Sequence, residues 1–216
     1  MRSFIIVSAT VLVVLSVTYL ANLGLENKSS ADTQDITITA TVDTAMTFSA
    51  TAGDTVAFGT LTPGSAVAAP ATGTVLSVTT NAANGYTIGA SDGTTGTDSC
   101  LLNADTTTRI GDYAGTITTP TSWTGTGLGF TLYAADTSKE ATWGTGTTYN
   151  DANNKYAGAP ETATTAHTVT GYHGSADTSS WAFKLDVPTT QKTGAYSCNE
   201  DNGNHYFTFT ATAVLT

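Results

Sequence analysis

Residues 35–48 read Asp-Ile-Thr-Ile-Thr-Ala-Thr-Val-Asp-Thr-Ala-Met-Thr-Phe, and apolar and polar side chains alternate along nearly all of this stretch. Apart from Thr44, every even position from Ile36 to Phe48 is apolar. Successive side chains of a strand point to opposite faces, so the pattern predicts one long, half-buried strand. Residues 206–215 repeat the alternation at the other end of the chain. Strands at both ends must be paired, or they leave adhesive sheet edges.

The rest of the chain predicts an all-β fold. It contains 48 threonines, which favour pleated, half-wet surfaces, and 21 glycines. No segment after residue 31 keeps a 3.6-residue apolar period, and some eight or nine short strands are separated by turns. We therefore expect an immunoglobulin-like antiparallel β-sandwich over residues 32–216, preceded by an N-terminal signal helix.

Three local patterns add detail to this fold. Residues 75–80 and 86–90 flank Asn84-Gly85, a favoured tight-turn pair, which predicts a hairpin. Trp181 heads an alternating strand with Phe183, Leu185 and Val187, which predicts a core strand. Residues 91–126 are rich in Gly, Thr and Asp, and indicate a long connection with short strands.

Residues 1–31 have the features of an export signal. Arg2 precedes a largely apolar stretch from Phe4 to Ala21, and Ser29-Ser30-Ala31 offers small residues for cleavage. An uncleaved membrane anchor is the alternative, because the apolar stretch is near the lower length limit for a spanning helix. In both cases residues 32–216 are exported, to the cell surface or the extracellular space, and only the N-terminal segment contacts membrane.

The formal net charge of −10 argues against nucleic acid or anionic lipid as the main ligand. The chain has two cysteines, Cys100 and Cys198. An even count in an oxidising compartment predicts a disulfide, with two free buried thiols as the alternative.

Several short motifs resemble the spore coat protein U family, which includes archaic chaperone–usher pilins. They are Phe58-Gly59-Thr60-Leu61, Leu76-Ser77-Val78-Thr79-Thr80, Tyr86-Thr87-Ile88, Phe130-Thr131-Leu132-Tyr133, Trp143-Gly144-Thr145-Gly146-Thr147 and Gly194-Ala195-Tyr196. The family commonly carries a cysteine soon after the first strand, where this chain has Thr51 and Gly53. Residues 187–196 also look like part of the WxL-domain surface proteins, although the Trp-x-Leu signatures are absent. Both resemblances imply a bacterial envelope β-sandwich.

These observations lead to two functional hypotheses. The first is a pilin-like structural subunit that self-associates by strand complementation, with Ile36, Ile38, Ala40 and Val42 as the donor positions. The same residues could instead form the first strand of their own sandwich. The second hypothesis is a monomeric adhesin or glycan-binding module that contacts its ligand through Trp123 and Trp143.

Catalysis and cofactor binding have little support in the sequence. His167, His173 and His205 are not spaced as a helical zinc site, and no Gly-x-Ser-x-Gly motif occurs, so we expect no enzyme and no cofactor. Residues 92–98 and 199–204 cluster oxygen donors of the kind that calcium binds. Asp, Asn and Gly are also ordinary turn formers, and the turn interpretation is favoured.

Overall fold

The computed structural model describes residues 37–68, 73–198 and 205–215. The expected signal helix, Ile36 and the loop at residues 199–204 lie outside this range. The chain divides into two units, Met1–Thr41 and Val42–Thr216, and the sheets belong to the second. Among the described residues, no helix is long and apolar enough to cross a membrane.

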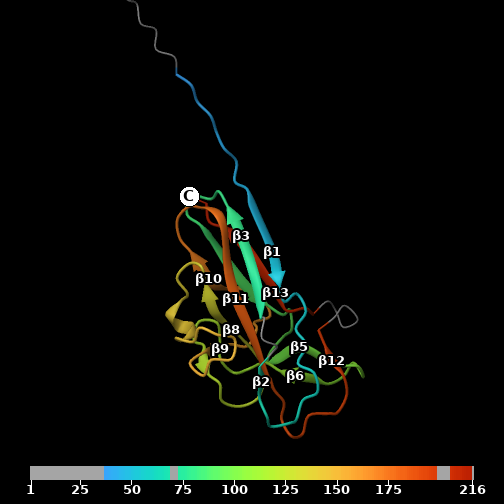
Figure 1. Ribbon diagram of the computed structural model, residues 1–216. Helices are drawn as coiled ribbons and strands as arrows, with labels where there is room; N and C mark the ends of the chain where they lie inside the picture. The colour runs from blue at the N-terminus through green and yellow to red at the C-terminus, as the bar shows by residue number, and fades with distance from the viewer. Residues whose placement is uncertain (1–36, 69–72, 199–204, 216) are drawn as a thin grey trace, which may run out of the picture. The chain divides into compact units, whose positions relative to one another are not determined.

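The larger of two main sheets has five strands, all paired antiparallel (Figure 1). Its order is β1, β3, β11 and β2, with β8 also paired to β11. The strands are β1 (Met46–Ala52), β2 (Val67–Ala68), β3 (Thr74–Thr80), β8 (Gly127–Ala135) and β11 (His173–Asp186). The longest, β11, pairs β3 with its first half and β8 with its second.

The second sheet has three antiparallel strands in the order β10, β4 and β13. They are β4 (Tyr86–Ser91), β10 (Thr164–Val169) and β13 (Thr208–Ala213). The connections add two small sheets and a 3-10 turn, η1 (Ala141–Trp143). The small sheets consist of β5 (Asp98–Asn103), β6 (Arg109–Gly111) and β12 (Tyr196–Ser197), and of β7 (Thr121–Ser122) and β9 (Lys155–Tyr156).

The two main sheets enclose one hydrophobic core. Inward-facing residues of β3, β4, β8, β10 and β11 contribute to it, including Val78, Ile88, Phe130, Val169 and Trp181. Trp181 is fully buried, as its alternating strand predicts. Each large apolar side chain buried in this way contributes about 1.5–3 kcal/mol. The chain is therefore an all-β protein built from antiparallel sheets, in a sandwich-like arrangement.

The predicted hairpin at Asn84-Gly85 is wrong. β3 pairs with β1 and β11, whereas β4 pairs with β10 and β13, so the turn carries the chain from one sheet to the other. Leu76 and Val78 consequently belong to one sheet and Ile88 to the other, and all three are in the same core. Alternation predicted both strands and their buried faces, but it cannot tell a paired strand from one that faces it across the core.

The predicted strand over residues 35–48 is only partly correct. β1 begins at Met46, and it continues to Ala52, beyond the predicted end at Phe48. Residues 37–45 form no strand, and their side chains are exposed. The alternating pattern therefore begins well before β1, and only its last three residues, 46–48, lie in that strand.

Candidate functional site

Among the described residues, β1 and β13 each end a sheet with a single partner strand, as β2 and β10 also do. β1 pairs only with β3, and β13 pairs only with β4. Figure 1 shows both strands along the same side of the sandwich, and both pack against the same core. We call this side of the molecule, between β1 and β13, the open edge.

The inward side chains of the open edge are incompletely covered. Met46 and Phe48 of β1 are partly buried against the core, as are Phe209 and Ala211 of β13 and the preceding Phe207. The ring of Phe209 lies 4.8 Å from that of Trp181, and the ring of Phe207 lies 4.8 Å from that of Phe183. These side chains pack against the core, but they remain partly exposed, whereas the core residues of the inner strands are buried.

Of the features that usually block edge pairing, β1 has a bulge-like irregularity, but neither strand of the open edge carries a charge or a proline. Natural edge strands are protected by charged residues, prolines or covering segments. β1 reads Met-Thr-Phe-Ser-Ala-Thr-Ala and β13 reads Thr-Phe-Thr-Ala-Thr-Ala, without charge or proline, although β1 has one irregularity between Ala50 and Ala52. The opposite sides of both sheets are engaged: Ala157 bridges to Phe130 of β8, and Glu140 accepts a hydrogen bond from Thr168 of β10.

The described candidate donor residues, Ile38, Ala40 and Val42, lie outside the sheets. Ile38 is 87% exposed and Val42 is 82% exposed, and Ala40 is exposed as well. Ile36 precedes the described residues.

Asn81 fixes the point where this segment enters β1. Its side-chain oxygen accepts a 2.7 Å bond from the Ala45 amide, and its side-chain nitrogen donates a 2.8 Å bond to the Asp43 carbonyl. Its own backbone amide donates to the Ala45 carbonyl at 3.2 Å. Nothing in the sequence singles out Asn81 for this role, because its partners lie more than 30 positions away.

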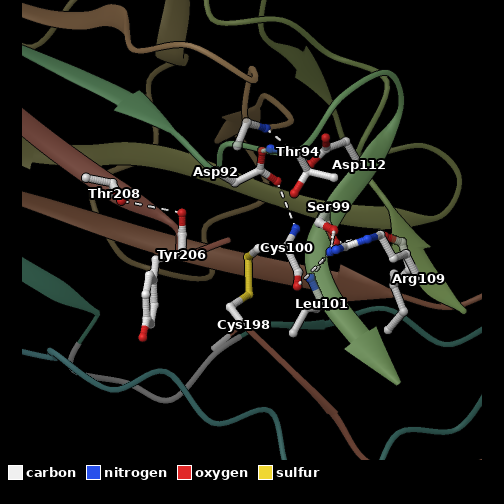
Figure 2. Close-up of a disulfide and its surroundings, with 12 residues drawn as sticks. Asp92, Thr94, Ser99, Cys100, Leu101, Arg109, Asp112, Cys198, Tyr206 and Thr208 are labelled. Carbon is white, nitrogen blue, oxygen red and sulfur yellow. Dashed lines mark hydrogen bonds between the residues drawn. A yellow bond between two sulfur atoms is a disulfide. The ribbon is translucent and has the colours of Figure 1, made fainter. Parts of the chain in front are cut away.

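The predicted disulfide is present. Cys100 of β5 and Cys198, which follows β12, are bonded across a separation of 98 residues (Figure 2). Cys100 is part of a second core cluster with Ile110, Leu128 and Leu185. The disulfide therefore joins the connection after β4 to the segment that leads toward β13.

The prediction that Trp143 contacts a ligand is wrong. Trp143 is only 1% exposed, its ring lies 5.5 Å from that of Phe130, and its indole nitrogen donates to the Ala166 carbonyl at 2.9 Å. Gly144 and Gly146 follow it closely, and a Gly-rich stretch is typical of a loop. The loop exists, but it inserts the indole into the core between the sheets.

Trp123 is half-buried and is held within the protein. It stacks on Tyr113 with 4.3 Å between ring centroids and an interplanar angle of 9°, and Tyr156 meets it edge-on at 5.2 Å. Lys184 lies 5.2 Å above the same ring. A Cβ on Gly129 would lie 2.8 Å from the Trp123 ring, so the indole also covers a glycine of β8. Trp123 and Trp143 therefore do not form a coplanar exposed platform.

A pair formed by Glu140 and the buried His167 links the connection after β8 to β10. His167 Nδ1 lies 2.9 Å from Glu140 Oε2, and His167 Nε2 lies 3.3 Å from the Thr137 hydroxyl. Glu140 also accepts a 2.6 Å bond from the Thr168 amide. Burial alone would raise the pKa of Glu140, but the His167 and Thr168 contacts outweigh burial and lower it. A hydroxyl, an imidazole and a carboxylate in line resemble a hydrolase relay, but His167 is 1% exposed and serves here as a structural link.

Two aspartates meet near the disulfide. Asp92 is fully buried, and its carboxylate accepts bonds from the amides of Thr94 at 3.0 Å and Cys100 at 2.9 Å. Asp112 accepts a 3.3 Å bond from the Ala159 amide. Burial raises the pKa of Asp112 to about 8, with further increases from the charges of Asp92 and Asp98. The sequence identified residues 92–98 as a cluster of oxygen donors, whereas no sequence pattern pointed to Asp112.

Comparisons of the chain with protein-family models, with curated proteins and with solved structures each find no significant match. The resemblance to the spore coat protein U family therefore stays a prediction.

Proposed function

We propose that this chain is an exported, pilin-like structural subunit with an immunoglobulin-like sandwich, and that copies of it assemble on the cell surface by strand complementation. Residues 36–42 of one copy would lie along the open edge of the next copy. The observation that carries the proposal is the combination of an alternating segment, whose described residues form no strand, with a sheet edge that has no charge or proline and is lined by partly buried aromatic residues.

The donor segment and the open edge have matching lengths. From Ile36 to Val42 an extended chain spans roughly 20 Å, at about 3.3 Å per residue. β1 has seven residues, which is the same span at the same rise, and the six residues of β13 span about 17 Å. Four donor positions at a spacing of two would all face the core, while the intervening threonines would face solvent.

Both partners would gain stability from this pairing. Main-chain hydrogen bonds would satisfy the free side of an edge strand, and the alternate side chains would set the register. Burial of Ile38 and Val42, which are now almost fully exposed, would contribute about 1.5–3 kcal/mol each. The same burial would cover Phe48 and Phe209, which have the incomplete cover described above.

The direct test removes residues 32–42 from the exported chain. The truncation stops before Asp43 because Asn81 binds Asp43 and Ala45, and β1 begins at Met46. The truncated protein should stay folded and monomeric in size-exclusion chromatography, whereas the full exported chain should form concentration-dependent oligomers. A synthetic peptide of residues 34–44 should bind the truncated protein and raise its melting temperature.

The matched control is a peptide of the same length in which Ile38 and Val42 are replaced by Asp. It should neither bind nor stabilise the truncated protein, because both changes fall on the inward face. The proposal fails if the truncated protein oligomerises like the full chain. It also fails if the native peptide has no effect on a folded, truncated protein.

A further inference from the structure

Near the disulfide, the buried carboxylate of Asp92, the half-buried carboxylate of Asp112 and one unsatisfied hydroxyl come together. Thr94 is 6% exposed, and its buried Oγ1 has no hydrogen-bond partner. Figure 2 shows Thr94 between Asp92 and Asp112, beside the Cys100–Cys198 bond. A buried hydroxyl without a partner costs about 1–3 kcal/mol, so its retention next to two carboxylates requires an explanation.

The backbone holds the two carboxylates close to one another. The Asp92 amide donates to the Pro160 carbonyl at 3.1 Å, and the Ala159 amide donates to the Asp112 carboxylate at 3.3 Å. Two consecutive residues of one segment therefore anchor both aspartates. The Asp112 amide is bound as well, to the Thr97 carbonyl at 2.7 Å.

The nearby charges do not balance this pair. His205 and Arg109 act to lower the pKa of Asp92, against the larger effect of burial, and the net shift is upward. The charges that act on Asp112 are those of Asp92 and Asp98, and both raise its pKa. Arg109 is already bonded to the carbonyls of Ser99 and Cys100. An additional positive charge placed between the carboxylates would stabilise both of them.

We propose that Asp92, Asp112 and Thr94 bind a calcium ion that strengthens the corner of the domain around the disulfide. All three offer hard oxygen donors, which calcium prefers, and two carboxylates match its double charge. Main-chain carbonyls and water complete its shell of six to eight oxygens, as in other calcium sites. The described residues contain no cluster of three or more His, Cys, Asp or Glu placed to hold a metal, so this site depends on the hydroxyl and carbonyl oxygens.

The site goes beyond the proposed assembly function and does not depend on it. The test uses the full exported chain, treated with a chelator and then titrated with calcium chloride, in isothermal titration calorimetry and in thermal melts. Binding should saturate by about 10 mM calcium, since extracellular sites have dissociation constants of about 0.1–1 mM. The melting temperature should rise with calcium, and magnesium at the same concentration should have a smaller effect.

Thr94→Val is the decisive variant, because it removes the hydroxyl and keeps the shape of the side chain. Without calcium it should be as stable as the native protein or more stable, since the hydroxyl has no partner to lose. With calcium its affinity should fall by about tenfold or more. Asp112→Asn should abolish the response, whereas Asp151→Asn, in an exposed turn of another loop, should leave it unchanged.

Two results would overturn the proposal. One is the absence of binding heat and of a melting shift in the native protein at about 10 mM calcium. The other is native calcium affinity in Thr94→Val. If Asp112→Asn raises the melting temperature of a protein that does not respond to calcium, the aspartates share a proton and no cation is bound.

Discussion

A Cβ atom on Gly85 would lie 2.0 Å from the carbonyl oxygen of Val169. Gly85 precedes β4, and Val169 ends β10, which pairs with β4. The Gly85 carbonyl also accepts a 2.9 Å bond from the Val214 amide, just beyond β13. This glycine therefore lies where all three strands of the second sheet meet, at the turn that takes the chain from one sheet to the other.

Gly85→Ala should destabilise the domain more than Gly171→Ala does. The two glycines have nearly the same φ, +86° and +87°, but a Cβ on Gly171 would have no atom within 4 Å. Both variants incur the strain of a left-handed conformation, about 1–2 kcal/mol. Gly85→Ala should cost at least about 1 kcal/mol more, because the backbone must move away from Val169. Urea denaturation of both variants measures the difference, and equal losses would show that the close approach relaxes without cost.

The Glu140–His167 pair should make the stability of the domain depend on pH in the acidic range. The pKa of Glu140 lies below its ordinary value of 4.5 because the contacts with His167 and Thr168 outweigh burial. A carboxylate with a lowered folded-state pKa stabilises the protein above its unfolded pKa, and this contribution disappears as the pH falls through the folded value. Glu140→Gln should therefore cost stability at about pH 7, and its deficit should shrink below about pH 4.5. Urea denaturation of both proteins from about pH 7 to pH 3 tests this, and a deficit that stays constant over the whole range would contradict it.

Removal of the disulfide should cost about 2–5 kcal/mol of unfolding free energy, the range typical of small domains that lose a native disulfide. The bond closes a loop of 98 residues, so the unfolded chain gains considerable freedom when it is lost. The double variant Cys100→Ser/Cys198→Ser should match the native protein measured in reductant. Intact mass should show that the native protein gains two hydrogens on reduction. Two thiols that alkylate freely under non-reducing denaturation would contradict the bond.

The sequence predicted the strands better than their partners. The alternation in residues 206–215 led correctly to β13, and the alternation after Trp181 led correctly to a buried strand. These predictions depend only on which side chains of a strand are buried, and the alternation of apolar and polar residues shows this directly. The turn at Asn84-Gly85 was placed correctly, but pairing depends on the whole chain, and β4 finds its partners more than 70 and more than 110 residues later.

Of the candidate site, the sequence could predict only the part that lies in one continuous segment of the chain. The candidate donor positions were visible in residues 35–48, but the open edge required knowledge of which strands lie last in their sheets. Trp143 was misread because a Gly-rich loop can still deliver an aromatic ring to the core. Asp112 and Asn81 gave no signal in the sequence, because their partners are distant along the chain.

Ile38→Asp and Thr39→Asp should separate strand complementation from other modes of association. The two positions are adjacent, both are exposed in the single chain, and the two substitutions add the same charge. In an inserted strand, Ile38 would face the core and Thr39 would face solvent. A buried, unpaired carboxylate is strongly unfavourable, so Ile38→Asp should abolish concentration-dependent oligomers, whereas Thr39→Asp should keep them. Sedimentation velocity over a range of concentrations measures both, with the melting temperature of each variant as a check that the fold is intact. Equal losses in the two variants would indicate that charge alone prevents association, and strand complementation would then be excluded as its cause.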